Sequence, residues 1–247
     1  MKLFEATFVD RFLSSLRRKS KEQNQSERRK GRLLAHLGID LAIDVGANRG
    51  QYGRHLRMLG YARRIVSLEP GSEAYAHLVE AASADACWEV RRLALGARGE
   101  TRTFHIAGNI GMSSSFLDML PAHSAAAPNA DYVGAEEIET VPLDAIFATL
   151  RGAARHVFLK LDVQGMEAEV LHGAAASLPT IDLIELECSL VPLYRGELLL
   201  PAMIERLGAA GFMPVGLSGG FDDQRTGQLL QVDALFARRE LFTARSE

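Results

Sequence analysis

The sequence has few of the features that mark secreted or membrane-spanning proteins. Only two of its 247 residues are cysteines, Cys87 and Cys188, and neither lies in a metal-binding spacing. So few cysteines argue against a disulfide-stapled secreted fold, and we expect two buried free thiols in a reducing compartment. No apolar run approaches the roughly 18 residues that suggest a membrane span, and no signal peptide is evident. We therefore expect a cytoplasmic protein.

Positive charge is also scarce outside one segment. The chain has 28 basic and 31 acidic residues, a net charge of −3. Residues 17–32 (RRKSKEQNQSERRKGR) contain eight of the basic and two of the acidic residues, which leaves 20 basic and 29 acidic residues, a net charge of −9, elsewhere. Such an acidic remainder argues against a nucleic-acid-binding core.

The N-terminal segment has its own pattern. Apolar residues recur at helical spacing over residues 3–18, which predicts an amphipathic helix. The basic stretch that follows has no apolar face and is typical of a mobile linker or a solvated helix. We therefore divide the chain into an N-terminal helix with a basic linker (1–36) and one α/β domain (37–247). The segment could pack on the domain edge, contact the inner face of an anionic membrane, or mediate a homodimer.

From residue 40 onward, short apolar runs alternate with helical stretches. Strands are expected over residues 41–46, 64–70, 88–95, 101–107, 156–163 and 180–189. Helices are expected over residues 49–59, 72–84, 141–150, 166–176 and 198–210. Two further strands, 212–218 and 229–239, follow with no helix between them, and residues 108–135 form a long polar loop with some helix. This order predicts a doubly wound, mostly parallel seven-stranded sheet, Rossmann-like, with a terminal antiparallel hairpin.

The turn after the first expected strand carries the strongest functional signal. It reads DVGANRG over residues 44–50, and ligands of open α/β sheets bind at this end of the strands. Gly46 allows a sharp turn, and Gly50 lets the backbone approach a ligand. The spacing G-x-N-x-G differs from the G-x-G-x-x-G of dinucleotide-binding loops. We expect Asp44 to take an ammonium group and the turn amides to take a carboxylate, the two charged groups of the amino-acid end of S-adenosylmethionine (SAM).

A second acidic residue strengthens this interpretation. The next expected strand ends in Glu69, 19 residues after Gly50, where a carboxylate can accept hydrogen bonds from both ribose hydroxyls. NAD enzymes use the same device, so Glu69 alone does not decide between the cofactors. The loop and Glu69 together favour SAM, whereas an isolated glycine-rich turn would be simply a turn.

The motifs of the chain resemble those of the FkbM methyltransferases over roughly residues 40–240. The resemblance rests on DVGANRGQY (44–52), SLEPGSEAYAHL (67–78), LALGARGE (93–100), FLKLDVQGMEAEVLHGA (158–174), IELE (184–187) and QVDALFAR (231–238). It implies a class I SAM-dependent O-methyltransferase acting on a hydroxyl of a natural product or of a sugar in a glycolipid or polysaccharide. The loop containing GMSSSF (111–116) looks like the variable region of the family, so acceptor choice is expected there.

The predicted cofactor-binding residues lie at or beside the ends of the expected strands. They are Asp44, Gly46, Ala47, Asn48, Gly50, Tyr52, Glu69, Pro70, Leu95, Asp162 and Val163.

Methyl transfer to a hydroxyl also needs a general base or a metal ion. Asp162 and Glu187 are expected on adjacent strand ends, where they could share a proton, a lysine or Mg²⁺. Lys160 could orient one of these carboxylates, and His123 could act as a base from the long loop. Asp233 is a weaker candidate for a third metal ligand.

Two alternatives remain open at this stage. A structural ion pair between Lys160 and Glu185 or Glu187 would explain these charges without catalysis. The chain could also be a non-catalytic SAM- or nucleotide-binding module tethered to a membrane assembly. An NAD-dependent oxidoreductase is a distant third, because the loop spacing disfavours it.

Overall fold

The computed structural model describes residues 25–243 of the chain. The amphipathic helix predicted over residues 3–18 lies outside this part. Residues 25–36 are helical, so the described portion of the basic stretch is helix. Leu34 of this helix is buried, and Lys30 forms an ion pair with Glu185 in the sheet. The division of the chain at residue 36 stays a prediction.

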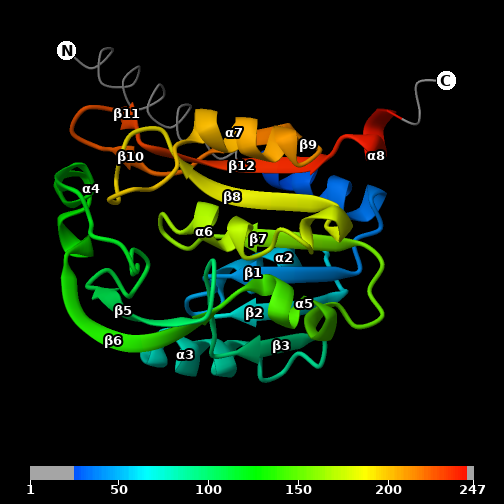
Figure 1. Ribbon diagram of the computed structural model, residues 1–247, viewed down its shortest axis with the longest axis horizontal. Helices are drawn as coiled ribbons and strands as arrows, with labels where there is room; N and C mark the ends of the chain where they lie inside the picture. Colours follow the sequence, from blue (N-terminus) through cyan, green and yellow to red (C-terminus); the bar gives the residue numbers. More distant parts are fainter. Residues whose placement is uncertain (1–24, 244–247) are drawn as a thin grey trace, which may run out of the picture.

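The predicted doubly wound sheet is present and has seven strands in the order β3-β2-β1-β7-β8-β12-β9 (Figure 1). Its strands are β1 (Leu41–Val45), β2 (Arg64–Leu68), β3 (Trp88–Arg91), β7 (Val157–Leu161), β8 (Leu183–Ser189), β9 (Phe212–Gly219) and β12 (Gln231–Arg238). The first five strands in this order, from β3 to β8 across the sheet, are parallel to one another. β12 runs antiparallel to both of its neighbours, β8 and β9. β1 and β7 are buried at every position, as expected for central strands covered on both faces.

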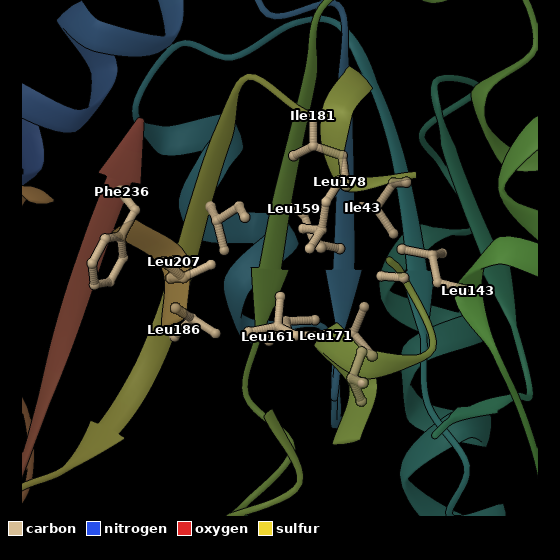
Figure 2. Packing of buried hydrophobic residues seen from close by; sticks show 14 of the residues in the cluster. Ile43, Leu143, Leu159, Leu161, Leu171, Leu178, Ile181, Leu186, Leu207 and Phe236 are labelled. Atoms are coloured by element: carbon tan, nitrogen blue, oxygen red, sulfur yellow. The ribbon is translucent and has the colours of Figure 1, made fainter. Parts of the chain in front are cut away.

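Helices cover both faces of the sheet. Besides the helix over residues 25–36, the helices of the described residues are α2 (Gln51–Met58), α3 (Ser72–Ala82), α4 (Pro121–Ala126), α5 (Leu143–Arg151), α6 (Glu167–His172), α7 (Leu200–Ala209) and α8 (Glu240–Thr243), with 3-10 turns at Pro128–Ala130 and Leu178–Thr180. α4 lies beyond one end of the sheet rather than on a face (Figure 1). Figure 2 shows one apolar layer, in which strand residues such as Leu159 and Leu186 pack against Leu143 of α5, Leu171 of α6 and Leu207 of α7. The opposite layer packs α2, α3 and the helix over residues 25–36 on the other face.

A second, smaller sheet corrects the sequence analysis. The run expected as one strand over residues 88–95 is divided into β3 and β4 (Ala94–Leu95), and β4 leaves the main sheet. It pairs with β6 (Tyr132–Val141), which pairs in turn with β5 (Glu100–Ala107). β6 was not predicted, and it begins within the range expected as loop. β6 is exposed or half-buried at nearly every position and carries three glutamates, so it lacks the apolar run of a central strand.

The C-terminal pair of strands matches the expected antiparallel hairpin, with an insertion. The short strands β10 (Asp222–Asp223) and β11 (Gln228–Leu229) lie in the connection between β9 and β12. Because β12 lies between β8 and β9, it brings Asp233 directly opposite Glu187 of β8.

Two further features bear on the expectations for cysteine and for membrane-spanning segments. Cys188 is buried as expected but Cys87 is exposed, and no helix between residues 25 and 243 is both long and apolar enough to cross a membrane.

Candidate active site

A cleft of about 1290 Å³ opens where the parallel strands β1, β2, β7 and β8 end. Its floor is formed by residues that directly follow these strands or lie at their ends, including Gly46, Glu69, Asp162 and Glu187. Its walls come from residues 109–114 and from the connection between β9 and β12. In Figure 1, α4, β10 and β11 gather beyond this end of the sheet. The cleft therefore lies where an open α/β sheet binds its ligands.

The turn between β1 and α2 depends on glycine. Gly46 has a φ of +79°, and a Cβ atom at this position would lie 1.8 Å from the carbonyl oxygen of Asp162. The backbone of β1 therefore passes β7 at a distance that only glycine permits. Gly50 also has positive φ, caps the N-terminus of α2 and packs against Trp88 from the neighbouring strand β3. Gly46 thus forms the sharp turn that the sequence pattern predicted, whereas an approach of Gly50 to a ligand stays a prediction.

The amides of this turn are not free, which corrects one expectation. The N–H groups of Gly46 and Ala47 both donate to the carbonyl oxygen of Leu68, at 3.0 and 3.1 Å. The N–H of Asn48 donates to Glu69 Oε2 at 2.8 Å. A ligand carboxylate would therefore meet the first turn of α2, where an α-helix leaves amides without intrahelical acceptors, rather than the turn itself. Gln51 and Tyr52 of that helical turn line the cleft.

Glu69 is held in the cleft by backbone donors. Besides the bond from Asn48, its Oε1 accepts a hydrogen bond from the N–H of Gly71 at 2.8 Å. Burial raises the pKa of Glu69 to about 7, although the two amide hydrogen bonds act in the opposite direction. Each carboxylate oxygen can accept a further hydrogen bond, so Glu69 is placed to receive two hydroxyl donors. Its neighbour Pro70 also lines the cleft.

A buried lysine lies at the centre of the charged floor. Lys160 Nζ is 2.9 Å from Asp162 Oδ2 and 3.7 Å from Asp44 Oδ1. Burial would lower the pKa of Lys160, but Asp162, Asp44 and Glu185 together raise it above its usual value. Lys160 is therefore a fixed positive charge that orients Asp162. Asp44 is fully buried and accepts a hydrogen bond from Ser67 Oγ at 3.0 Å, while its Oδ1 has no hydrogen-bond partner.

Glu185 has a different partner from the one considered in the sequence analysis. It does not pair with Lys160 as its main partner, because Lys30 Nζ lies 2.6 Å from its Oε1 and Tyr52 donates to its Oε2 at 2.8 Å. Lys30 belongs to the helix over residues 25–36 and lines the cleft. No local sequence pattern predicts this contact, because Lys30 and Glu185 are 155 positions apart. Tyr52, predicted as a cofactor contact, lies under both lysines, with Lys160 Nζ 4.8 Å from its ring centre.

Glu187 lies beside a glutamine that the sequence analysis placed only in a turn. Gln164 Nε2 donates to Glu187 Oε2 at 2.6 Å and to Asp162 Oδ1 at 2.7 Å. Gln231 donates more weakly to the same Glu187 oxygen, at 3.3 Å. Burial, together with Asp162 and Asp233, raises the pKa of Glu187 well above its usual value. The structure thus brings together Asp162 and Glu187 as predicted, with an amide group between them.

His123 lies in the wall of the cleft and is almost fully buried. Its Nε2 is 3.1 Å from Ser113 Oγ, and its Nδ1 has no hydrogen-bond partner. Burial lowers the pKa of His123 to about 4, so the imidazole is neutral at physiological pH. Its ring packs edge-on against Tyr194 and near Phe221. His123 therefore helps to join the loop to the cleft wall, and its low pKa makes it a weak proton acceptor.

Some predicted site residues do not line the cleft. Asp44 and Gly50 lie behind its surface, and Leu95 is buried in the apolar layer shown in part in Figure 2. A side-chain contact between Leu95 and a ligand is therefore not expected. Ala47, Asn48 and Val163 do line the cleft. Among the described residues, no group of three or more His, Cys, Asp and Glu side chains is arranged to hold a metal ion.

The sheet order, the glycine turn after β1 and the carboxylate after β2 define a Rossmann-like fold of the SAM-dependent methyltransferase class. The family profile described as "Methyltransferase FkbM domain" matches residues 44–214. The chain belongs to this family, as the motif resemblance predicted. Lys30, Gln231 and Asp233 are among the cleft residues that lie outside the matched range.

The solved structures named below are distant likenesses of this chain. No curated protein matches the chain. The fold is similar to magnesium protoporphyrin IX methyltransferase from Synechocystis PCC 6803 with bound SAM (11% identity, 90% of this chain and 81% of that chain, TM-score 0.47). It is also similar to an rRNA methylase from Streptococcus thermophilus (9% identity, 85% and 93%, TM-score 0.46). A third similar structure is the 1,6-didemethyltoxoflavin-N1-methyltransferase of Burkholderia thailandensis with bound S-adenosylhomocysteine (15% identity, 95% and 88%, TM-score 0.42).

The residues of the cleft fit SAM. Gly46 keeps the floor free of side-chain atoms, Glu69 offers acceptors for the ribose hydroxyls, and the first turn of α2 offers donors for the carboxylate. Acidic side chains on the floor, among them Asp162, suit the ammonium group and the positive sulfonium centre. An ammonium contact through Asp44 stays a prediction, since its buried carboxylate already lies near Lys160.

Proposed function

We propose that the protein transfers the methyl group of SAM to a hydroxyl of a sugar in a glycolipid, a polysaccharide or a glycosylated natural product, with Glu187 as the general base. The observation that carries the proposal is the Glu187 carboxylate, which lines the cleft with no ion pair among the described residues. When bound, SAM supplies an electrophilic methyl group on a sulfonium centre. The chain must then position the acceptor and remove its hydroxyl proton.

The surroundings of the carboxylates favour Glu187 for the proton. Asp162 is held by Lys160 and Glu185 by Lys30, so both carboxylates are neutralised by a nearby ammonium group. Glu187 instead receives amide hydrogen bonds, which leave it a better proton acceptor. Burial also raises the pKa of Glu187, so its carboxylate binds a proton more strongly than an exposed glutamate would. The hydroxyl proton of the acceptor would pass to Glu187 as the oxygen attacks the methyl carbon.

The lining of the cleft supports an acceptor that is both hydroxylated and partly apolar. Its deeper part offers many hydrogen-bond acceptors, whereas exposed apolar side chains surround its walls: Ile110, Met112, Leu217 and Leu229. A sugar linked to a lipid or a polyketide has this combination of chemistry. The exposed arginines Arg28, Arg29 and Arg32 support contact with an anionic membrane surface, where a glycolipid would lie.

The test is transfer of labelled methyl from SAM to glycolipid extracts presented in anionic or neutral vesicles, with Mg²⁺ or with EDTA. We expect labelled lipid, more of it with anionic vesicles. We also expect transfer to persist in EDTA, because the Gln164 amide already occupies the space between Asp162 and Glu187. Cofactor binding without transfer to any extract, accompanied by vesicle binding, would instead support the tethered non-catalytic module.

Cofactor affinity is expected to depend on pH through Glu69. Ribose hydroxyls donate to the ionised carboxylate, so binding favours the deprotonated form of a group whose pKa is about 7 in the free protein. Affinity for S-adenosylhomocysteine should therefore rise as the pH increases from 5.5 and level off above the pKa, with a loss of up to about tenfold per pH unit below it. Calorimetric titration at several pH values measures this.

The control for this pH dependence is Glu69→Gln, which cannot ionise. We expect weaker binding with a flatter pH profile, and the difference between the two profiles isolates the contribution of Glu69. Parallel profiles would show that another group causes the pH dependence.

A further inference from the structure

Gln164 connects the carboxylates of the cleft floor with the loop above them. It is buried, directly follows the strand-end residues Asp162 and Val163, and has a positive φ of 52°. Few non-glycine residues adopt this conformation without a compensating constraint. Here the constraint is visible, because Ser115 Oγ donates to the Gln164 carbonyl at 2.7 Å and Tyr194 donates to its side-chain Oε1 at 2.7 Å.

The amide of Gln164 can have only one orientation. Asp162 is ion-paired with Lys160, and a carboxylate in an ion pair accepts hydrogen bonds and cannot donate them. The NH₂ group must therefore face Asp162 and, with it, the adjacent Glu187. The Oε1 atom then faces Tyr194, whose single hydroxyl proton must be donated to it. The alternative acceptor for that proton, the carbonyl oxygen of Ser113, is more distant at 3.2 Å. Tyr194 is fully buried and anchored in a small apolar cluster with Leu193 and Leu230, so its hydroxyl has a fixed position.

We propose that Gln164, fixed by Tyr194, is a positioning residue that holds Asp162 and Glu187 together in the cleft and keeps Glu187 available as a proton acceptor. The inference rests on the proposed function, since it acts through Glu187. It also gives the loop over residues 109–117 a role, because Ser113 and Ser115 contact the same Tyr194–Gln164 pair. An acceptor that displaces this loop would change the environment of Glu187.

Several other charged groups influence Glu187 and must be kept constant in a test. Lys160 of β7 and Asp162, which directly follows β7, face it, as do Asp233 of β12 and Glu167 at the start of α6. Gln164 differs from all of these because it bonds directly to Glu187 and is itself uncharged. Its substitution therefore changes the titration of Glu187 without removing a neighbouring charge.

The experiment is a pH titration of the glutamate side-chain carboxyl carbons by NMR, with Glu187 assigned from the resonance that is missing in Glu187→Gln. In Gln164→Met the ionised carboxylate loses its closest donor, and in Gln164→Glu it gains a negative neighbour. Both changes should raise the titration midpoint of Glu187 by about one pH unit or more. Tyr194→Phe should raise it less, because the amide is retained but no longer held. Thr149→Glu, an exposed charge change on α5 away from the cleft, and Tyr75→Phe are the controls and should leave it unchanged.

The outcomes separate this inference from the proposed function. Unchanged Glu187 midpoints in folded Gln164→Met and Tyr194→Phe would overturn the inference, whether or not the enzyme methylates an acceptor. Raised midpoints in a protein that transfers no methyl group would leave Gln164 as the positioning residue and overturn the proposed reaction. A merely structural role would lower the thermal midpoint of unfolding without moving the titration of Glu187. If Gln164→Glu fails to fold, the other two variants still decide.

Discussion

Replacing Glu187 by glutamine is expected to reduce the rate of methyl transfer by about 10²- to 10⁴-fold, the range typical for loss of a general base. The substitution preserves shape, and the carbonyl oxygen of the introduced amide can still accept the hydrogen bond from Gln164. Affinity for S-adenosylhomocysteine should therefore stay within about threefold of the wild-type value, less than about 1 kcal/mol in binding free energy. Single-turnover assays and calorimetry measure the two effects separately.

Glu80→Gln is the matched control for this prediction, because Glu80 is exposed on α3, away from the cleft. It should retain full activity. A Glu187→Gln variant that keeps more than about a tenth of the wild-type rate would show that another group takes the proton, and Asp162 and Asp233 would then be the next candidates.

Gly46→Ala is expected to destabilise the fold and abolish cofactor binding together. The added Cβ would lie 1.8 Å from the Asp162 carbonyl oxygen, a backbone atom that cannot move without shifting the end of β7. The strained φ and the steric overlap together should lower the free energy of unfolding by about 2–5 kcal/mol. Urea unfolding measures this loss, and titration with S-adenosylhomocysteine measures the loss of binding.

Gly60→Ala isolates the conformational part of that cost. Gly60 has a similar φ of +85°, but a Cβ there would meet no atom within 4 Å. Its substitution should cost only about 1–2 kcal/mol and leave cofactor binding intact. Equal losses of stability in the two variants would mean that β1 and β7 can separate easily, and that the close approach at Gly46 is not a constraint on the fold.

Sequence patterns identified the elements whose burial is uniform. The runs of β1 and β7 are apolar because both faces of a central parallel strand are covered, so their positions could be predicted from the sequence alone. β6 could not be predicted because its exposed or half-buried residues include Glu136, Glu137 and Glu139, and because it is fixed by pairing with β5 rather than by an apolar pattern. The small sheet is therefore a property of tertiary pairing.

The candidate site likewise combines features that local sequence predicts with features that depend on long-range contacts. The Gly46 turn and Glu69 are local features, because each follows directly from where a strand ends. Lys30 and Tyr194 enter the site only through contacts with residues 155 and 30 positions away, which no local spacing can indicate. The turn amides show a different limit of sequence reasoning. The motif indicates that N–H donors are present in the turn, but it does not show that they already donate to the Leu68 carbonyl of β2.

The position of β12 has a consequence for how the protein is made. β12 follows β8 and β9 in the sequence, so both are synthesised before it, yet it inserts between them in the sheet. Until it arrives, both neighbours expose unpaired backbone groups, the condition under which nascent chains aggregate or recruit chaperones. It also carries Gln231 and Asp233 to their places beside Glu187. The nascent chain therefore lacks part of its acidic cleft until β12 has been translated.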